Sequence, residues 1–277
     1  MIFHTTRSIA RFIYSGFFFL LFFLPNTADA QLALLDKKQS TTCVDREFTV
    51  MVHMVRDTFQ NVGTTVENIE IAMEVLNTWF EPICVRFEVA SIDTIDNFQY
   101  SVPANLNELE QLWTNHNAEN RINLYIVRDL TRVSPEPVYA TDEGILQLER
   151  GGVLINRNEF NDFPVWLVHA FGHYCGLLDT NTDFPNQIVT DPNCDATGDQ
   201  LCDTPADPLD PSAPFGGLGI YFDETCRFIY TPVDANGEYF LTQTGNAMSR
   251  YPSFCWCGLT YEQFERMAGV IAQSPLW

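Results

Sequence analysis

The chain has 277 residues, of which 15 are Lys or Arg and 36 are Asp or Glu, so its formal net charge is −21. This acidity argues against nucleic acid and against anionic membrane surfaces as partners, because both require a basic face. With 46% hydrophobic and 18% charged residues, the composition is that of a folded globular chain and excludes a disordered one.

The N-terminus carries the three-part pattern of a secretory signal peptide. Arg7 and Arg11 precede an apolar run from Phe12 to Leu24, and Ala28-Asp29-Ala30 follows as a cleavage site. The apolar run is shorter than the ~20 residues that a membrane-spanning helix needs. We therefore expect residues 1–30 to be removed, the mature chain to be extracellular or periplasmic without membrane contact, and residues 31–45 to form a loose leader. An uncleaved N-terminal anchor is the alternative.

Hydrophobic patterns predict the elements of the mature chain. Alternating, β-branched segments predict strands at 47–55, 85–95, 122–127 and 152–156, the last of them at a sheet edge. Apolar residues at helical spacing predict helices at 66–80, 106–113, 163–178 and 260–273. Thr64 and Thr65 can cap the first of these helices, and Thr260 with Gln263 forms a capping box for the last.

This order of elements predicts an α+β fold in which residues 46–277 form one domain of two lobes. The N-terminal lobe, residues 46–178, combines a twisted mixed sheet with helices. The C-terminal lobe, residues 179–277, has weak periodicity and many Pro, Gly and Asp residues, and it ends in a helix.

The eight cysteines all follow the predicted cleavage site, and an even number in an exported chain indicates disulfides. The sequence alone leaves about 105 pairings open. Most of the cysteines lie in the irregular C-terminal lobe, so we expect disulfides to stabilise it. They are Cys43, Cys84, Cys175, Cys194, Cys202, Cys226, Cys255 and Cys257.

The segment from His169 to Asp179, HAFGHYCGLLD, offers a set of metal ligands. His169 and His173 are one helical turn apart, so both imidazoles face one side and can reach one zinc ion at about 2.0–2.1 Å. Gly176 can end the helix in a left-handed conformation, and the returning chain can then present the Asp179 carboxylate to the same ion. The alternative is a pair of histidines that make ordinary hydrogen bonds in a packed helix.

HAFGHYCGLLD resembles the HExxHxxGxxH zinc motif of metzincin proteases, and further segments resemble the pappalysin (cytophagalysin-type) branch of that family. These segments are GGVLIN at 151–156, GDQLCDTPADP at 198–208, NAMS at 246–249 and LTYEQFERM at 259–267. The resemblance runs from about residue 47 to residue 271. It implies a metzincin-like (zincin) catalytic domain with a cleft between its lobes that holds zinc and binds a polypeptide.

The resemblance also assigns roles to residues outside the histidine segment. Met248 corresponds to the Met-turn methionine beneath the zinc site. Asp199 and Thr204 correspond to residues that help to hold calcium in relatives, and hard oxygen ligands on a loop suit that ion. The alternative is a solvated acidic loop, since Asp191, Asp195, Asp199, Asp203 and Asp207 crowd this segment.

Three positions depart from the family's pattern. Ala170 stands where the family has the glutamate that acts as general base, and general acid–base catalysis typically contributes ~10²–10⁴-fold to a rate. Asp179 stands where the family usually has a third histidine. Arg250 stands where the family has a tyrosine near the oxyanion, and either Arg250 or the next residue, Tyr251, could take over that role.

These departures predict a secreted pseudoprotease that keeps the zinc site and a polypeptide-binding cleft but has weak or absent hydrolysis. The alternative is an active zinc-dependent metalloendopeptidase in which another residue, with Glu143 and Glu149 as candidates, replaces the missing base. A third reading is a structural secreted domain without zinc.

Overall fold

The computed structural model describes residues 40–147, 151–210 and 220–276. The predicted signal peptide, the leader up to residue 39 and Glu149 lie outside the described residues. None of the helices in the described part of the chain is long and apolar enough to cross a membrane.

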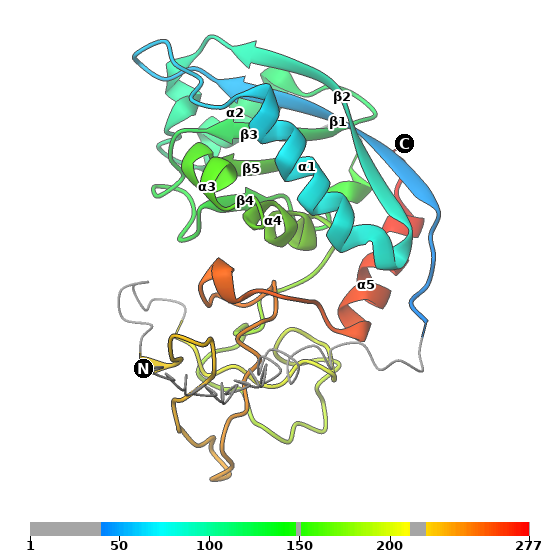
Figure 1. Cartoon of the computed structure of the whole chain (residues 1–277), viewed down its shortest axis with the longest axis vertical. Helices are drawn as coiled ribbons and strands as arrows, with labels where there is room; N and C mark the ends of the chain where they lie inside the picture. The colour runs from blue at the N-terminus through cyan, green and yellow to red at the C-terminus, as the bar shows by residue number, and fades with distance from the viewer. Residues whose placement is uncertain (1–39, 148–150, 211–219, 277) are drawn as a thin grey trace, which may run out of the picture.

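The sheet has five strands in the order β2-β1-β3-β5-β4 (Figure 1). All neighbours pair in parallel except β4 and β5, which are antiparallel. The bounds are β1 Arg46–Val55, β2 Val85–Ile95, β3 Ile122–Val127, β4 Val138–Ala140 and β5 Val153–Asn156. The prediction that β5 lies at a sheet edge is wrong, because β4 covers it. Three residues are too few for β4 to show a period in the sequence.

Within the described residues, five α-helices accompany the sheet; four of them overlap predicted helices, and the short helix at 157–162 has no counterpart in the prediction. They are α1 Val66–Phe80, α2 Leu106–His116, α3 Arg157–Asp162, α4 Trp166–Tyr174 and α5 Tyr261–Ala272. Short 3-10 turns occupy Glu81–Ile83, Phe98–Ser101, Gly144–Leu146 and Ser253–Cys255. Capping boxes at Thr65 and Thr260 begin α1 and α5.

The helix predicted at 163–178 is shorter and begins later than expected. Pro164 disfavours a helical conformation for Phe163, whose φ and ψ are −138° and 67°, so α3 ends before it and α4 begins at Trp166. At the other end, Gly176 has a φ of +87°. The amide of Leu177 donates to the Gly172 carbonyl and that of Gly176 to the His173 carbonyl, which is the hydrogen-bond pattern of a Schellman motif.

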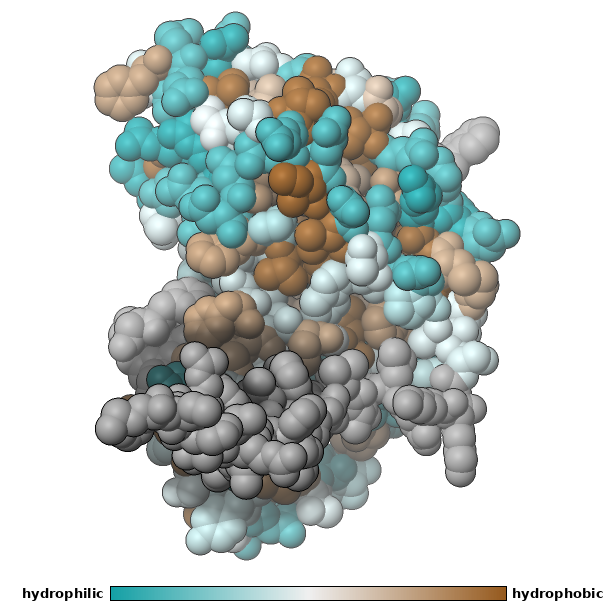
Figure 2. Space-filling model, viewed as in Figure 1, coloured by the Kyte–Doolittle hydropathy of each residue, from teal (hydrophilic) through white to brown (hydrophobic). Residues whose placement is uncertain are grey.

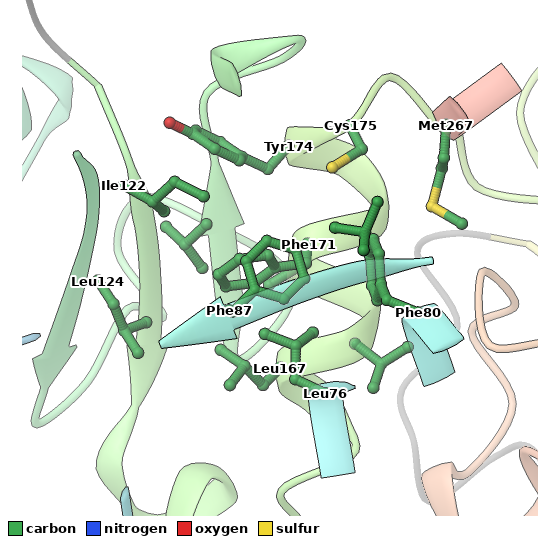
Figure 3. Close-up of a cluster of buried hydrophobic side chains, with 14 of the residues drawn as sticks. Leu76, Phe80, Phe87, Ile122, Leu124, Leu167, Phe171, Tyr174, Cys175 and Met267 are labelled. Atoms are coloured by element: carbon green, nitrogen blue, oxygen red, sulfur yellow. The ribbon is translucent and has the colours of Figure 1, made fainter. Parts of the chain in front are cut away.

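Helices cover both faces of the sheet. On one face, α1 and α4 pack against alternate residues of β1 and β3, and the rings of Phe80, Phe87 and Phe171 meet edge to face at 4.9–6.5 Å (Figure 3). On the other face, α2 packs through Leu109 and Leu112 against the intervening residues of the same strands. The buried helix α4 is thereby fixed against the sheet.

The segment between α4 and α5 is irregular and winds below the sheet (Figure 1). Disulfides join Cys194 to Cys202 and Cys226 to Cys255 within it, and a third joins Cys43 to Cys84 beside β1 and β2. The predicted disulfides therefore form among six of the eight cysteines, and the other two are free: Cys175 is fully buried and Cys257 is exposed.

Helix α5 returns to the N-terminal part of the chain. The Glu265 carboxylate accepts from the amide and the hydroxyl of Thr42 at 2.6 and 2.7 Å, and Arg46 donates to the Leu276 carbonyl at 2.6 Å. On the face shown in Figure 2, hydrophilic residues cover most of the described surface of the sheet region and border a smaller hydrophobic area, in keeping with the acidic composition.

Met248 lies directly beneath α4. Its side chain is fully buried, and its amide donates to the Asn246 side chain at 2.8 Å. A Cβ atom on Gly172 would overlap the Met248 thioether, so the close approach of this segment to the helix requires glycine at position 172.

We predict that Gly172→Ala destabilises the chain by roughly 1–3 kcal/mol, the usual cost of overpacking a core. The matched control is Gly269→Ala in α5, where an added Cβ meets no atom within 4 Å. This control should stabilise the chain by roughly 0.5–1 kcal/mol, because alanine replaces glycine inside a helix. Chemical denaturation of both variants measures the difference, and equal free energies of unfolding would contradict the predicted contact.

Candidate metal centre

Four side chains converge at the end of α4. They are Glu136 from the segment before β4, His169 and His173 from α4, and Asp179 from the turn after it; one ligand atom from each lies within 4.8 Å of all the others. The Schellman motif at Gly176 reverses the chain so that Asp179 returns to the histidines. The structure thus brings together the three predicted zinc ligands and adds a fourth candidate, Glu136.

The ligand atoms are spaced as one small ion would require. The two histidine Nε2 atoms are 3.0 Å apart, and Asp179 Oδ1 lies 3.4 Å from each of them. Glu136 Oε2 lies 3.0 Å from His169 Nε2. Ligands held tetrahedrally at about 2.0–2.1 Å from zinc are about 3.3 Å from one another.

Backbone carbonyls fix the tautomers of both imidazoles. His169 Nδ1 donates to the Ala247 carbonyl at 2.7 Å, and His173 Nδ1 donates to the Leu177 carbonyl at 2.9 Å. A carbonyl can only accept, so the proton of each neutral ring is on Nδ1 and each Nε2 presents a lone pair to the other. This is the arrangement of metal-binding histidines, whose second nitrogen is bound to an oxygen.

The carboxylate of Asp179 supports the same conclusion. Its Oδ1 atom is buried and makes no hydrogen bond. Two inward lone pairs and two carboxylate oxygens repel one another unless a positive charge lies between them. The donor set therefore fits a divalent cation, and imidazole with carboxylate suits zinc.

Without a metal ion, a proton supplies part of that positive charge. Burial would lower the pKa of His173, but the carboxylates of Asp179 and Glu136 and the Leu177 carbonyl raise it to about 9. Burial would raise the pKa of Asp179, but the imidazoles of His173 and His169 and the Arg250 guanidinium lower it below its usual value. A metal ion must displace this proton to bind.

Aromatic rings and the core enclose the first histidine. The His169 ring stacks on Trp256 at 5.3 Å and meets Trp166 edge to face at 5.4 Å, and its side chain is fully buried. The His173 and Asp179 side chains are 23% and 26% exposed, so an ion can reach the site from their side. Ala170 is fully buried in the hydrophobic core.

The structure separates the two residues considered for the oxyanion role. Arg250 lies in the site, where its Nε atom is 2.7 Å from Glu136 Oε1. The fully buried Tyr251 donates its hydroxyl to Asp207 Oδ1 at 3.1 Å. Burial, followed by the charge of Asp207, raises the pKa of Tyr251, so its proton remains in that hydrogen bond.

The residues considered as a replacement base or a calcium site lie elsewhere. Glu143 is exposed beside Gly176 and is not part of the four-residue cluster. Asp199 and Thr204 line a separate pocket of about 530 Å³ in the irregular segment. Sequence spacing could not reveal Glu136, because it precedes His169 by 33 positions and belongs to a proline-flanked segment without periodicity.

A scan of protein-family models finds no match to the sequence, and neither does a comparison with curated proteins. Among solved structures, the chain is similar to mature mirolysin of Tannerella forsythia in complex with a cleaved peptide. The sequence identity is 16% and the TM-score is 0.50, with 83% of this chain and 91% of that chain covered. A glutamate-to-alanine mutant of promirolysin from the same organism gives 15% identity and a TM-score of 0.51, with 87% and 84% covered.

At these identities the likeness establishes the fold. The chain has a metzincin-like α+β fold, as the sequence predicted. The cluster of two histidines and two carboxylates gives this fold a candidate metal-binding site at the end of α4.

We predict that the metal-free chain loses thermal stability as the pH rises from 7 to 10. The pKa of His173 is about 9 in the folded chain and 6.5 as its ordinary value, so the stabilisation from its proton is complete below pH 6.5 and is lost as the pH rises through about 9. Thermal denaturation in a chelator measures this loss. His173→Gln should flatten the profile over this range, and an unchanged profile in that variant would contradict the assignment.

Proposed function

We propose that this chain is a secreted pseudoprotease of the pappalysin type that binds zinc and polypeptide but does not hydrolyse peptide bonds efficiently. The observation that carries this proposal is Ala170 itself, which follows His169 on α4, is fully buried and has no group that can transfer a proton. The zinc ion would be held by His169, His173 and Asp179, and when bound it supplies a Lewis acid.

Export of the mature chain rests on two features of the sequence and structure. Residues 1–30 have the pattern of a signal peptide. The three disulfides are of the kind that persists in oxidising compartments outside the cytosol. An extracellular or periplasmic location accounts for both.

A polypeptide partner is supported by the surface beside the cluster. A pocket of about 400 Å³ contains His173, Asp179 and Arg250 and is bordered by strand β4. Because β4 is the last strand of the sheet order, an extended peptide could pair with it and pass over the pocket. The similar structure of mirolysin contains a cleaved peptide.

Glu136 favours one second candidate, an active zinc endopeptidase that uses this carboxylate as its base. Glu136 Oε2 lies 3.0 Å from His169 Nε2, whereas Glu143 is exposed. The ion pair with Arg250 argues against this candidate, since it holds the Glu136 carboxylate in one place.

We predict that the zinc-loaded mature chain leaves a mixed peptide library intact, because loss of the general base removes ~10²–10⁴-fold of rate. Mass spectrometry of the peptides, with and without a chelator, measures cleavage. Chelator-sensitive cleavage that Glu136→Gln abolishes would establish the second candidate instead. Cleavage that survives Glu136→Gln would contradict both.

We also propose calcium binding at Asp199 and Thr204. Thr204 donates its hydroxyl to Asp199 Oδ1 at 2.8 Å, while Asp199 Oδ2 and Asp203 Oδ1 are buried without a hydrogen-bond partner. Burial raises the pKa of Asp199 to about 7, partly offset by hydrogen bonds from Thr204 and Leu201. A hard cation in this pocket would be coordinated by the oxygen atoms of Asp199 and Asp203 that lack a hydrogen-bond partner.

Calcium at 100 times its dissociation constant should stabilise the chain by about 2.7 kcal/mol and raise its melting temperature. Asp199→Asn should remove most of this increase, because it removes a charged ligand from the buried position. Asp195→Asn is the matched control, since Asp195 is exposed in the same segment. The same calcium response in both variants would exclude this site.

A further inference from the structure

Glu136 is the one member of the cluster that neither the helix motif nor the resemblance accounts for. We propose that Glu136 is a fourth protein ligand, which closes the metal site and leaves no coordination position for water or substrate. This inference rests on the proposed zinc site and assigns a reason for inactivity that is independent of Ala170.

The distances support four protein ligands around one ion. In a cluster whose ligand atoms all lie within 4.8 Å of one another, four of the six separations among the two Nε2 atoms, Asp179 Oδ1 and Glu136 Oε2 are 3.0 to 3.4 Å. These values match the edges of a tetrahedron of about 3.3 Å expected for ligands at 2.0–2.1 Å from zinc. Catalytic zinc sites provide three protein ligands and keep the fourth position open, whereas structural sites fill all four.

The backbone holds Glu136 in this position. Its amide donates to the Ser134 hydroxyl at 3.1 Å, and that hydroxyl donates to the Val138 carbonyl at 2.8 Å. Pro135 and Pro137 flank the residue and restrict its backbone. The Pro137 carbonyl accepts from the Asn156 amide at 2.8 Å, which attaches the segment to the end of β5.

Arg250 fixes the other oxygen of the same carboxylate. Its Nε atom lies 2.7 Å from Glu136 Oε1, and both side chains are less than 10% exposed. With Oε1 directed at the guanidinium, Oε2 is left to face the imidazoles. A buried arginine needs a paired carboxylate, and Glu136 is the carboxylate that pairs with Arg250 here.

The ion pair between Arg250 and Glu136 therefore orients the Glu136 carboxylate toward the metal site. An arginine alone beside the metal would repel it, whereas an arginine paired with a ligand carboxylate orients that ligand. The tyrosine that the resemblance implies at position 250 carries no charge with which to hold Glu136 in this way. The departures at positions 170 and 250 then have separate effects, because the first removes the base and the second secures the closing ligand.

The test is the binding of azide to the cobalt-loaded mature chain, followed by the visible absorption of Co²⁺. Azide needs an open coordination position, so we expect no spectral change with the wild-type chain. Glu136→Ala should open the position, produce a spectral change on azide addition and weaken Co²⁺ binding by about tenfold or more. Glu143→Ala, which removes an exposed glutamate outside the cluster, should behave as the wild type.

The wild-type measurement alone decides the inference, so it does not depend on the folding of a variant. An azide-induced spectrum in the cobalt-loaded wild-type chain would overturn the closed site while leaving the proposed metal-binding pseudoprotease intact. A chain that binds neither Co²⁺ nor Zn²⁺ would overturn the metal site itself.

Discussion

The Nε2 atoms of His169 and His173 lie 3.0 Å apart at the end of α4, and the candidate metal centre depends on this arrangement. It results from two backbone carbonyls, those of Ala247 and Leu177, which each require a proton on the Nδ1 atom they contact. Neither ring can turn its proton inward without losing a buried hydrogen bond. The site therefore needs a positive charge, which a metal ion or a shared proton can supply.

Contacts of the irregular segment place the Ala247 carbonyl against His169 of α4. Asn246 exchanges hydrogen bonds with Gln263 of α5 at 2.9 and 3.2 Å, and the Ala247 amide donates to the Gly258 carbonyl. Met248 then fits beneath Gly172. The disulfide from Cys226 to Cys255 holds the segment that ends in Trp256, which stacks on His169. A segment with little regular structure thus positions the site through a few specific contacts with α4 and α5.

Most of the regular structure could be predicted because it depends on local signals. The predicted bounds are confirmed for the strands at 85–95 and 122–127 and for the helix at 66–80. The hydrophobic period and the capping residues that define these elements lie within the segments themselves. The three-residue β4 gives no period, and the end of α3 depends on Pro164, whose effect on Phe163 the hydrophobic pattern conceals. Disulfide pairing depends on the tertiary fold and stayed open until the structure defined it.

The candidate site likewise contains residues that the sequence predicts and residues that only the structure reveals. The spacing of His169, His173 and Gly176 encodes a helix face and a reversal, so the approach of Asp179 could be expected from the sequence. Glu136 could not be found, because its approach depends on tertiary contacts of the segment before β4, such as the hydrogen bond from the Asn156 amide to the Pro137 carbonyl. The sequence identifies Arg250 as a departure from the family's pattern, but only the structure shows its ion pair with Glu136, on which its role depends.

Calorimetric titration of the mature chain with zinc at pH 7 tests the central claim most directly, because it detects the ion and the proton that it displaces. We expect one equivalent to bind, with a heat that depends on the ionisation enthalpy of the buffer as the His173 proton is released. Binding should be lost when His169 and His173 are both replaced by alanine. Failure of the wild-type chain to bind zinc, or equal binding by the double variant, would contradict a metal centre at this site.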